Sequence, residues 1–199
     1  MSALHNVLLS WEAFEYDKNL ITEARAAGLP IMLKGVLQRA DTLNQNGRLY
    51  PLPILQREIR NYQKLINEGR AIGELDHPDS SVIELKNVSH IIREARMQGG
   101  VVHGAVELLN TPSGMILQSL LESGVKLGIS SRGVGSTKKS HDGYVVQDDF
   151  QLICWDFVSE PSTPGAFMLR EGKLSESQLH QYFTNGDRID RIVNDILEW

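Results

Sequence analysis

The sequence predicts an α+β fold in which a compact, mostly antiparallel β core is flanked by a few helices. Strand-like stretches dominate the middle of the chain. Two of them, residues 87–96 and 101–109, are joined across Gln98-Gly99-Gly100, which is typical of a β-hairpin. Only a few segments have the apolar spacing of a helix, and residues 52–68 form the clearest of these.

Composition limits the class of protein. The chain has 199 residues, of which 41% are hydrophobic and 23% charged, and its net charge is −5 at pH 7. The acidic balance argues against nucleic acid as the main partner. A single cysteine, Cys154, excludes an internal disulfide and fits a reducing cytoplasm. Since no apolar run reaches the ~18 residues of a membrane span, we expect a soluble cytoplasmic protein without a cofactor.

The first half of the chain alternates turn, strand and helix signals. Residues 1–30 have mixed content and end at Pro30, which predicts a separate N-terminal segment. Residues 31–40 alternate loosely and are apolar enough for a strand. The apolar residues of 52–68 lie on one face of a helix, and Pro53 stands near its start.

The second half contains one further helix and two strands. Thr111 followed by Pro112 predicts an N-cap and the first turn of a helix that ends near Ser123. The stretches 144–150 and 151–159 are strand-like.

The end of the chain changes character. From Asp187 onward the apolar residues follow the spacing of an amphipathic helix. We therefore expect a core domain over residues 31–170 and a helical tail over 171–199.

A stretch rich in small residues, 128–136, holds three glycines and three serines. This composition predicts a tight turn rather than a packed strand. A phosphate loop is excluded, because Val134 stands where the lysine of such a loop belongs. As a nucleophile turn the stretch offers Ser130, whose flanking glycines would let a substrate backbone approach. A turn without chemical function is the alternative.

A loop histidine is the second candidate. His77 lies close in sequence to Glu74, Asp76 and Asp79. Together these four residues have the donor types of a metal site, although short-range carboxylates around one histidine are weakly specific. As a general base, His77 needs a nucleophile and an orienting partner from elsewhere in the chain. A solvated or capping histidine is the remaining interpretation.

The third candidate is a carboxylate within an apolar strand. Asp156 lies in the stretch 152–158, in which both faces are apolar, so the strand is expected to be covered on both sides. A carboxylate there needs a hydrogen-bond partner, for which an imidazole N–H is suitable. A strand end that lets Asp156 reach water is the alternative.

Other residues compete for these roles. Cys154 has no base beside it and is interpreted as a core thiol. His90 and His103 lie in the predicted hairpin, and either is an alternative to Asp156 as the third member of a site.

Three blocks together resemble the prohead proteases of tailed phages. They are residues 46–51 (NGRLYP), 73–78 (GELDHP) and 128–136 (GISSRGVGS), in the family's order between residues 31 and 166. The resemblance implies a serine endopeptidase that shares its fold, a compact β-barrel ringed by helices, with the herpesvirus assembly proteases.

The resemblance also implies roles for the candidate residues. His77 corresponds to the family's catalytic histidine and Ser130 to its nucleophile, with Ser131 as the neighbouring serine. The herpesvirus enzymes carry a second histidine at about the place of Asp156. A carboxylate is chemically suitable there, because it orients an imidazole and stabilises its cation.

An oxyanion formed at the substrate needs backbone N–H donors. The candidates are the turn after Ser130, at Arg132 and Gly133, and a second turn that ends at Gly165. For the glutamate that the family's substrates carry before the cut bond, Arg132 and Lys126 are the candidate cations.

By resemblance, the substrates are the internal scaffold (core) and capsid proteins of the prohead, cut after a glutamate that follows an aliphatic residue two positions earlier. This chain has such triplets at 21–23, 174–176 and 196–198. The first two flank the core domain, so we expect self-processing that releases residues 1–23 and the tail. The expected setting is the assembling prohead in the host cytoplasm, with the protease as a homo-oligomer.

Two rival hypotheses remain. One is a non-enzymatic component of the prohead core that uses the glycine-serine stretch to contact a partner. The other is a metal-dependent hydrolase built on the carboxylates around His77.

Overall fold

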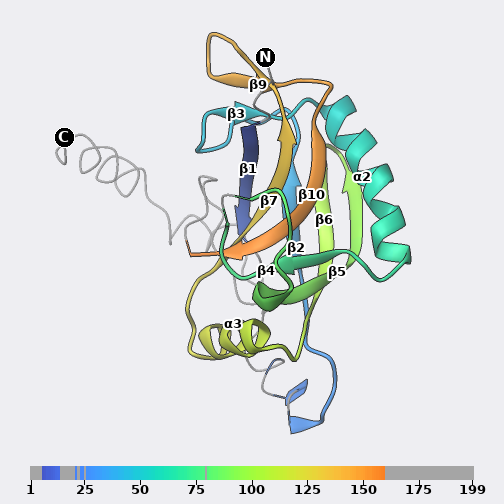
Figure 1. Cartoon of the computed structure of the whole chain (residues 1–199), viewed down its shortest axis with the longest axis vertical. Coiled ribbons are helices and arrows are strands. Elements are labelled where there is room, and N and C mark those ends of the chain that lie inside the picture. Colours follow the sequence, from blue (N-terminus) through green and yellow to red (C-terminus); the bar gives the residue numbers. More distant parts are fainter. Residues whose placement is uncertain (1–5, 14–20, 22, 25, 79, 160–199) are drawn as a thin grey trace, which may run out of the picture.

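A computed structural model describes residues 6–13, 21, 23–24, 26–78 and 80–159 of the chain (Figure 1). The fold is a mixed α+β fold with few helices, as the sequence predicts. Its strands and helices, in chain order, are β1 (Asn6–Ala13), β2 (Met32–Arg39), β3 (Arg48–Leu49), α2 (Leu52–Asn67), β4 (Ile72–Glu74), η1 (Leu85–Asn87), β5 (Val88–Gln98), β6 (Val101–Leu108), α3 (Pro112–Glu122), β7 (Gly128–Gly135), β8 (Thr137–Lys139), β9 (Tyr144–Val146) and β10 (Gln151–Val158).

The strands form three sheets, with the orders β1-β7-β10, β2-β6-β5-β4 and β3-β9-β8. Neighbouring strands are antiparallel, except that β3 and β9 are parallel. The hairpin of β5 and β6 confirms the pairing predicted across residues 98–100.

The predicted β-barrel is not closed among the described residues. Where β4 meets β10, the two sheets are joined by an isolated bridge between Leu75 and Phe157 instead of a continuous ladder. The backbone N–H of Glu74, next to this bridge, donates to the side-chain Oδ1 of Asp156 at 2.9 Å. A side chain therefore occupies the place that a backbone carbonyl would take in a longer ladder.

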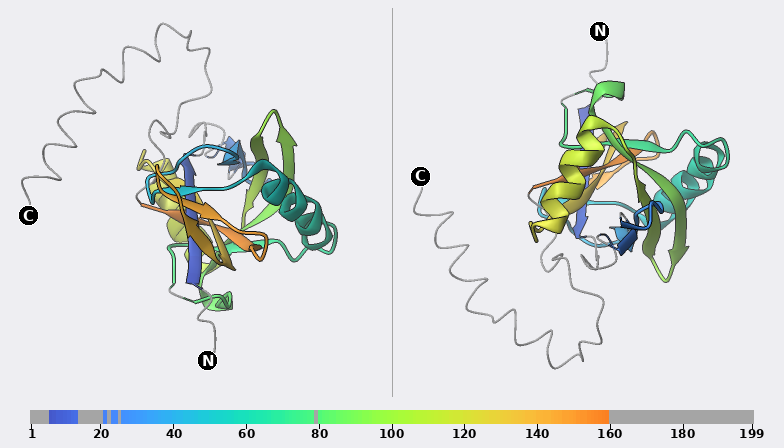
Figure 2. Two further views of the ribbon diagram at one scale, coloured as in Figure 1. Left: turned by 90° about the horizontal axis from the view of Figure 1, so that it is seen from above. Right: turned by 90° about the horizontal axis from the view of Figure 1, so that it is seen from below.

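Two helices cover different sides of the sheets (Figure 2). α2 packs along β5 and β10, and α3 lies across the end formed by β5, β6 and η1. One face of α2 is buried and carries Ile54, Leu55, Ile59 and Tyr62. At the start of α3, the Thr111 side chain accepts a hydrogen bond from the N–H of Gly114, which confirms the predicted N-cap. Within the described part of the chain, no helix has both the length and the apolar character needed to cross a bilayer.

The glycine-serine stretch is a central strand, so the predicted turn is wrong. β7 lies between β1 and β10, and seven of its eight residues are buried. Space requires glycine at two positions, Gly133 and Gly135: a Cβ atom on Gly133 would lie 2.4 Å from Cε2 of Phe150 and 2.6 Å from the carbonyl oxygen of Gln151. The strand expected over 144–150 is shorter and ends at Val146. Phe150 therefore lies in the segment between β9 and β10.

β1 belongs to the N-terminal part that the sequence separates from the main domain. Its backbone pairs with β7 along its whole length, from Asn6 opposite Gly135 to Ala13 opposite Gly128. After it, Ile21 is only 1% exposed and packs in the main core. The predicted helical tail lies outside the described residues.

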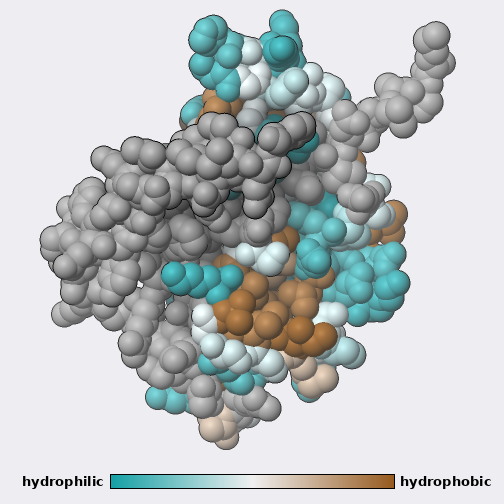
Figure 3. All heavy atoms as spheres, turned by 90° about the vertical axis from the view of Figure 1, so that its left-hand side faces the viewer, coloured by the Kyte–Doolittle hydropathy of each residue, from teal (hydrophilic) through white to brown (hydrophobic). Residues whose placement is uncertain are grey.

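Part of the surface is apolar. Figure 3 shows one face on which a contiguous apolar area is bordered by hydrophilic side chains. The large apolar side chains that are exposed among the described residues are Leu29, Met32, Leu43, Val82, Leu85, Met115, Ile116, Val125 and Tyr144.

His90 on β5 is a buried core histidine. Its Nε2 lies 2.9 Å from the carbonyl oxygen of Trp155 and its Nδ1 lies 2.9 Å from the hydroxyl of Ser89. A carbonyl only accepts, so Nε2–H donates to it and Nδ1 accepts from Ser89. Burial lowers the pKa of His90 to about 4, so the ring is neutral at physiological pH. Gly73 makes room for this ring, since a Cβ atom there would lie 2.4 Å from His90 Nε2.

We expect Gly133→Ala to lower the free energy of unfolding by about 1–3 kcal/mol, because the added methyl group overlaps the Phe150 ring and a backbone carbonyl. Chemical denaturation of the variant against the parent protein measures the change. Ser140→Ala, at an exposed position in the β8–β9 loop, is the control and should have little effect. Equal stability of the two variants would contradict the packing role of Gly133.

We expect the free energy of unfolding to fall as the pH is lowered from about 6.5 to about 4. In this range the unfolded chain protonates His90 while the folded protein keeps it neutral, which costs at most about 3 kcal/mol. Denaturation of the parent protein and of His90→Gln across this range measures the slope. The variant should show the weaker dependence on pH, and parallel slopes would contradict the assignment.

Candidate active site

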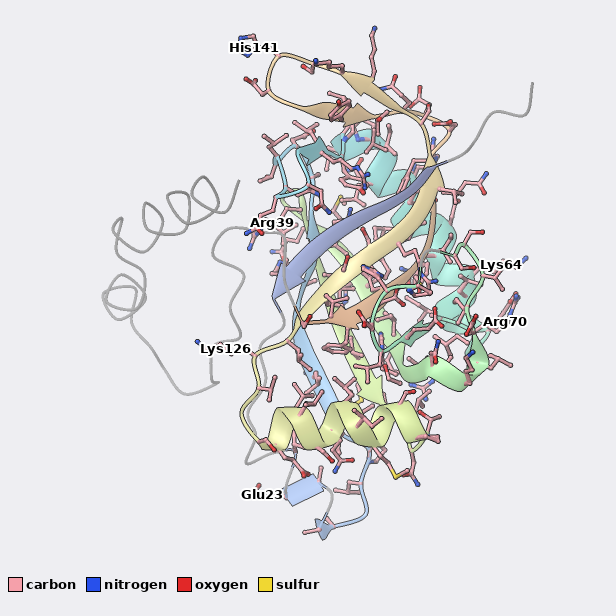
Figure 4. The ribbon with its side chains drawn as sticks, turned by 60° about the vertical axis from the view of Figure 1, so that its left-hand side comes forward. Glu23, Arg39, Lys64, Arg70, Lys126 and His141 are labelled. Carbon is pink, nitrogen blue, oxygen red and sulfur yellow. The ribbon has the colours of Figure 1, made fainter. Side chains whose placement is uncertain are left out.

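Three predicted site residues meet on one face of the β1-β7-β10 sheet. Ser130 on β7 stands directly opposite Asp156 on β10, so their side chains share a face. His77, from the loop after β4, bridges them: its Nδ1 lies 2.8 Å from Asp156 Oδ2 and its Nε2 lies 2.6 Å from Ser130 Oγ. Figure 4 shows the three ribbon segments from which these side chains come.

The hydrogen bonds orient the groups for proton transfer. Burial disfavours a charge on Asp156, but the hydrogen bond from His77, the charge of Arg132 and the N–H of Glu74 lower its pKa below the ordinary value. An ionised carboxylate only accepts, so Nδ1 of His77 carries the proton and donates it. With the second ring nitrogen unprotonated, Nε2 accepts from the Ser130 hydroxyl, which is the arrangement of a general base beside a nucleophile.

A strained residue directs the histidine toward the two strands. Asp76 has a φ of 71°, in the left-handed region that Asp tolerates better than most residues. Its N–H donates to the carbonyl oxygen of Phe157 at 2.7 Å, and its Oδ1 accepts from the N–H of His77 at 2.9 Å. The turn at Asp76 therefore ties the His77 loop to β10.

The site is closed in this structure. Ser130 and Asp156 are fully buried, and the side chain of His77 is 9% exposed.

Arg132 forms ion pairs inside the protein. Its side chain is fully buried and pairs with the carboxylates of Glu74 and Asp156. In this structure its guanidinium is therefore not exposed for the predicted contact with a substrate glutamate. The turn predicted to offer the N–H groups of Arg132 and Gly133 to an oxyanion is also absent, because both residues lie within β7, which is paired on both sides.

Other predicted binding residues lie elsewhere. Ser131 points to the opposite face of β7 from Ser130, where its hydroxyl is buried. Lys126 is exposed just before β7, and Figure 4 shows it pointing outward. Gly165 lies outside the described residues.

The alternative third members are not in the group. His90 binds the Trp155 carbonyl in the core, as described above, and His103 is exposed on β6 opposite Val36 and Arg96. Cys154 donates to Asp156 Oδ1 at 3.3 Å. Burial, with the nearby charge of Asp156, raises the pKa of its thiol well above the ordinary value, so it is not a thiolate nucleophile.

The carboxylates considered for a metal site have other partners. Glu74 is fully buried against Arg132, and its Oε1 accepts from the N–H of Glu84 at 3.0 Å. Asp79 lies outside the described residues. Among the described residues, no cluster of three or more His, Cys, Asp or Glu is arranged to hold a metal ion.

Sequence reasoning missed one feature of the site, the pairing of Glu74 with Arg132. The signal that was present is their position: Glu74 lies in the same sequence block as His77, and Arg132 lies in the same block as Ser130.

Comparisons with known proteins agree with the resemblance in these blocks. A sequence profile described as prohead core protein serine protease, peptidase family S77, matches residues 20–179. The prohead core protein protease of Enterobacteria phage T4 is 31% identical over 165 residues, which cover 79% of this chain and 76% of that protein. The solved structure of the bacteriophage T4 capsid assembly protease shares the fold, with a TM-score of 0.68 and 22% identity, over 79% of this chain and 99% of that chain. With a profile match over most of its length and a relative of this identity, the chain belongs to the prohead core protein serine protease family.

Proposed function

We propose that the protein is a serine endopeptidase in which Ser130 is the nucleophile, His77 the general base and Asp156 the orienting carboxylate. The observation that carries the proposal is the position of the imidazole, 2.6 Å from the Ser130 hydroxyl and 2.8 Å from the Asp156 carboxylate. Membership of a phage prohead protease family supports the same chemistry.

The reaction follows from the protonation states. As Ser130 Oγ attacks a peptide carbonyl, Nε2 of His77 takes the hydroxyl proton, and Asp156 stabilises the resulting imidazolium. The imidazolium gives this proton to the leaving amine, and an acyl-enzyme remains on Ser130. Water then attacks the ester with the same histidine as base, which releases the second product.

The proposed substrates are the scaffold (core) and capsid proteins of a phage prohead, cut after a glutamate that follows an aliphatic residue. The names of the two T4 relatives, a prohead core protein protease and a capsid assembly protease, support this setting inside an assembling prohead. Since Arg132 is buried in ion pairs, Lys126 is the exposed one of the two cations proposed for the substrate glutamate. A homo-oligomeric state and a common fold with the herpesvirus assembly proteases stay predictions of the resemblance.

The competing hypothesis is a non-enzymatic component of the prohead core. It predicts that a serine-directed phosphonate leaves the protein unmodified, whereas the proposed mechanism predicts a covalent adduct on Ser130.

We expect Ser130→Ala to abolish cleavage of a peptide that contains an aliphatic-x-Glu site, with a fall in kcat of about 10³-fold or more, because the nucleophile is lost. Ser131→Ala is the matched control and should retain most of the activity, since its hydroxyl lies on the other face of β7. Peptide hydrolysis and mass spectrometry of the phosphonate adduct measure both. Full activity of Ser130→Ala would contradict the mechanism.

We expect self-cleavage after Glu23 and Glu176, and slow cleavage at the first of these. Glu23 is exposed, and Figure 4 shows it pointing away from the sheets, but Ile21 is buried in the core. A protease binds its substrate extended, so Ile21 has to leave the core before the cut. Mass spectrometry of fragments over time measures the order of cleavage, with Ser130→Ala as the uncut control. Cuts confined to residues 31–166 would contradict the prediction.

A further inference from the structure

We propose that Glu74 and Arg132 form a buried positioning pair that orients Asp156 and leaves one net negative charge beneath His77. The inference rests on the proposed function, because it concerns the residues behind the same histidine.

The guanidinium of Arg132 faces both oxygens of Asp156. Its Nη2 donates to Oδ1 at 3.2 Å, and its Nε lies 2.9 Å from Oδ2, the oxygen that accepts from His77, as an ion pair without hydrogen-bond geometry. Its Nη1 donates to the carbonyl oxygen of Ser80 at 2.8 Å, and its Nη2 also pairs with Glu74. The plane of the Asp156 carboxylate is thereby held so that Oδ2 points at the imidazole.

Glu74 holds the same group from a second direction. Its backbone N–H donates to Asp156 Oδ1, and its carboxylate binds Arg132 and the N–H of Glu84. It is the last residue of β4, three positions before His77. A displacement of Glu74 would therefore disturb the carboxylate, the guanidinium and the His77 loop together.

The charges of the three buried groups sum to one negative charge. Arg132 alone would neutralise Asp156 and weaken its attraction for the imidazolium that forms when His77 takes a proton. With Arg132 missing, two neighbouring buried carboxylates would tend to share a proton, which would remove an acceptor. The pair of Glu74 and Arg132 avoids both outcomes.

The other titratable groups facing Asp156 carry no charge that competes with this balance. Burial keeps Cys154 a thiol and raises the pKa of Tyr62 well above its ordinary value, so both are neutral. His90, behind Trp155, is neutral as well. The net charge beneath His77 therefore depends on Glu74, Arg132 and Asp156.

Stability does not explain the pair well. Taking charged groups out of water has a large free-energy cost, and a well-packed apolar group often stabilises a core better. A buried pair that touches both oxygens of Asp156 is more simply explained by the chemistry at His77.

The test separates the effect of the net charge beneath His77 from the effect of lost contacts to Asp156. We measure the pH dependence of kcat/KM and of phosphonate labelling at Ser130 in the full chain, and locate the midpoint of the acid limb of each profile. Glu74→Gln leaves no net charge beneath His77, so its midpoint should fall by about 0.5–1 pH unit. The double variant Glu74→Gln with Arg132→Gln restores one negative charge, so its midpoint should return toward that of the parent protein although it has lost more contacts.

A second variant keeps the positive charge at position 132 and removes the planar guanidinium that orients Asp156. Arg132→Lys retains the positive charge but lacks the planar fork, so its midpoint should stay in place while kcat falls by about 10²-fold with little change in KM. This variant also decides the matter if Glu74→Gln does not fold, since unchanged kcat in Arg132→Lys would overturn the inference.

The matched control is an ion pair outside the site, in which only the carboxylate is buried. Glu58 is buried, accepts from Arg57 Nε at 2.8 Å and accepts from the N–H of Leu152 at 2.8 Å. Glu58→Gln should lower the unfolding temperature without moving the midpoint.

The outcomes separate the two proposals. Labelling at Ser130 with the same midpoint in the parent protein, Glu74→Gln and the double variant would overturn the positioning pair alone. A parent protein that is neither active nor labelled at Ser130 would overturn the protease mechanism and the positioning pair with it.

Discussion

The structure around the site depends on one buried charge, that of Asp156. A carboxylate removed from water must be satisfied by donors and by opposite charge, or it takes up a proton. Here the partners come from three separate segments: the N–H of Glu74 on β4, the imidazole of His77 in the following loop, and the guanidinium of Arg132 on β7. Satisfying Asp156 therefore brings these segments together with β10.

The same interaction explains a feature of the sheets. Glu74 uses its N–H for the Asp156 side chain, and only an isolated bridge joins Leu75 to Phe157 beyond it. The gap between β4 and β10 is thus the place where the His77 loop crosses the face of β7. An uninterrupted ladder there would take the N–H of Glu74 away from the carboxylate.

Local signals predicted the local elements well. The Pro53 and Thr111-Pro112 signals placed α2 and α3, and the glycines after Gln98 placed the β5–β6 turn. The stretch 128–136 was misinterpreted because glycine was judged by its backbone freedom. Gly133 and Gly135 are needed because Phe150, distant in sequence, occupies the space of a side chain, and no local pattern reveals such a contact.

For the candidate site, sequence reasoning named the three residues that meet but not what holds them. The grouping of His77 with Ser130 came from a resemblance over three blocks, since spacing alone does not say which loops meet. Asp156 was added because a carboxylate in an apolar strand needs a partner and because the herpesvirus enzymes have their third residue at about this place. The ion pair of Glu74 with Arg132 joins positions 58 residues apart, and its two members were considered for other roles. Long-range charge pairs of this kind follow from the three-dimensional fold.

β1 has a practical consequence for anyone who shortens the chain. The family profile begins at residue 20, whereas β1 covers Asn6–Ala13 and places Trp11 opposite Ser130. Trimming to the profile would strip the strand that flanks the proposed nucleophile and leave the backbone of β7 with an open edge. The unpaired N–H and C=O groups of such an edge can hydrogen-bond to an extended segment of another chain. We therefore expect a trimmed protein to self-associate for reasons unrelated to catalysis.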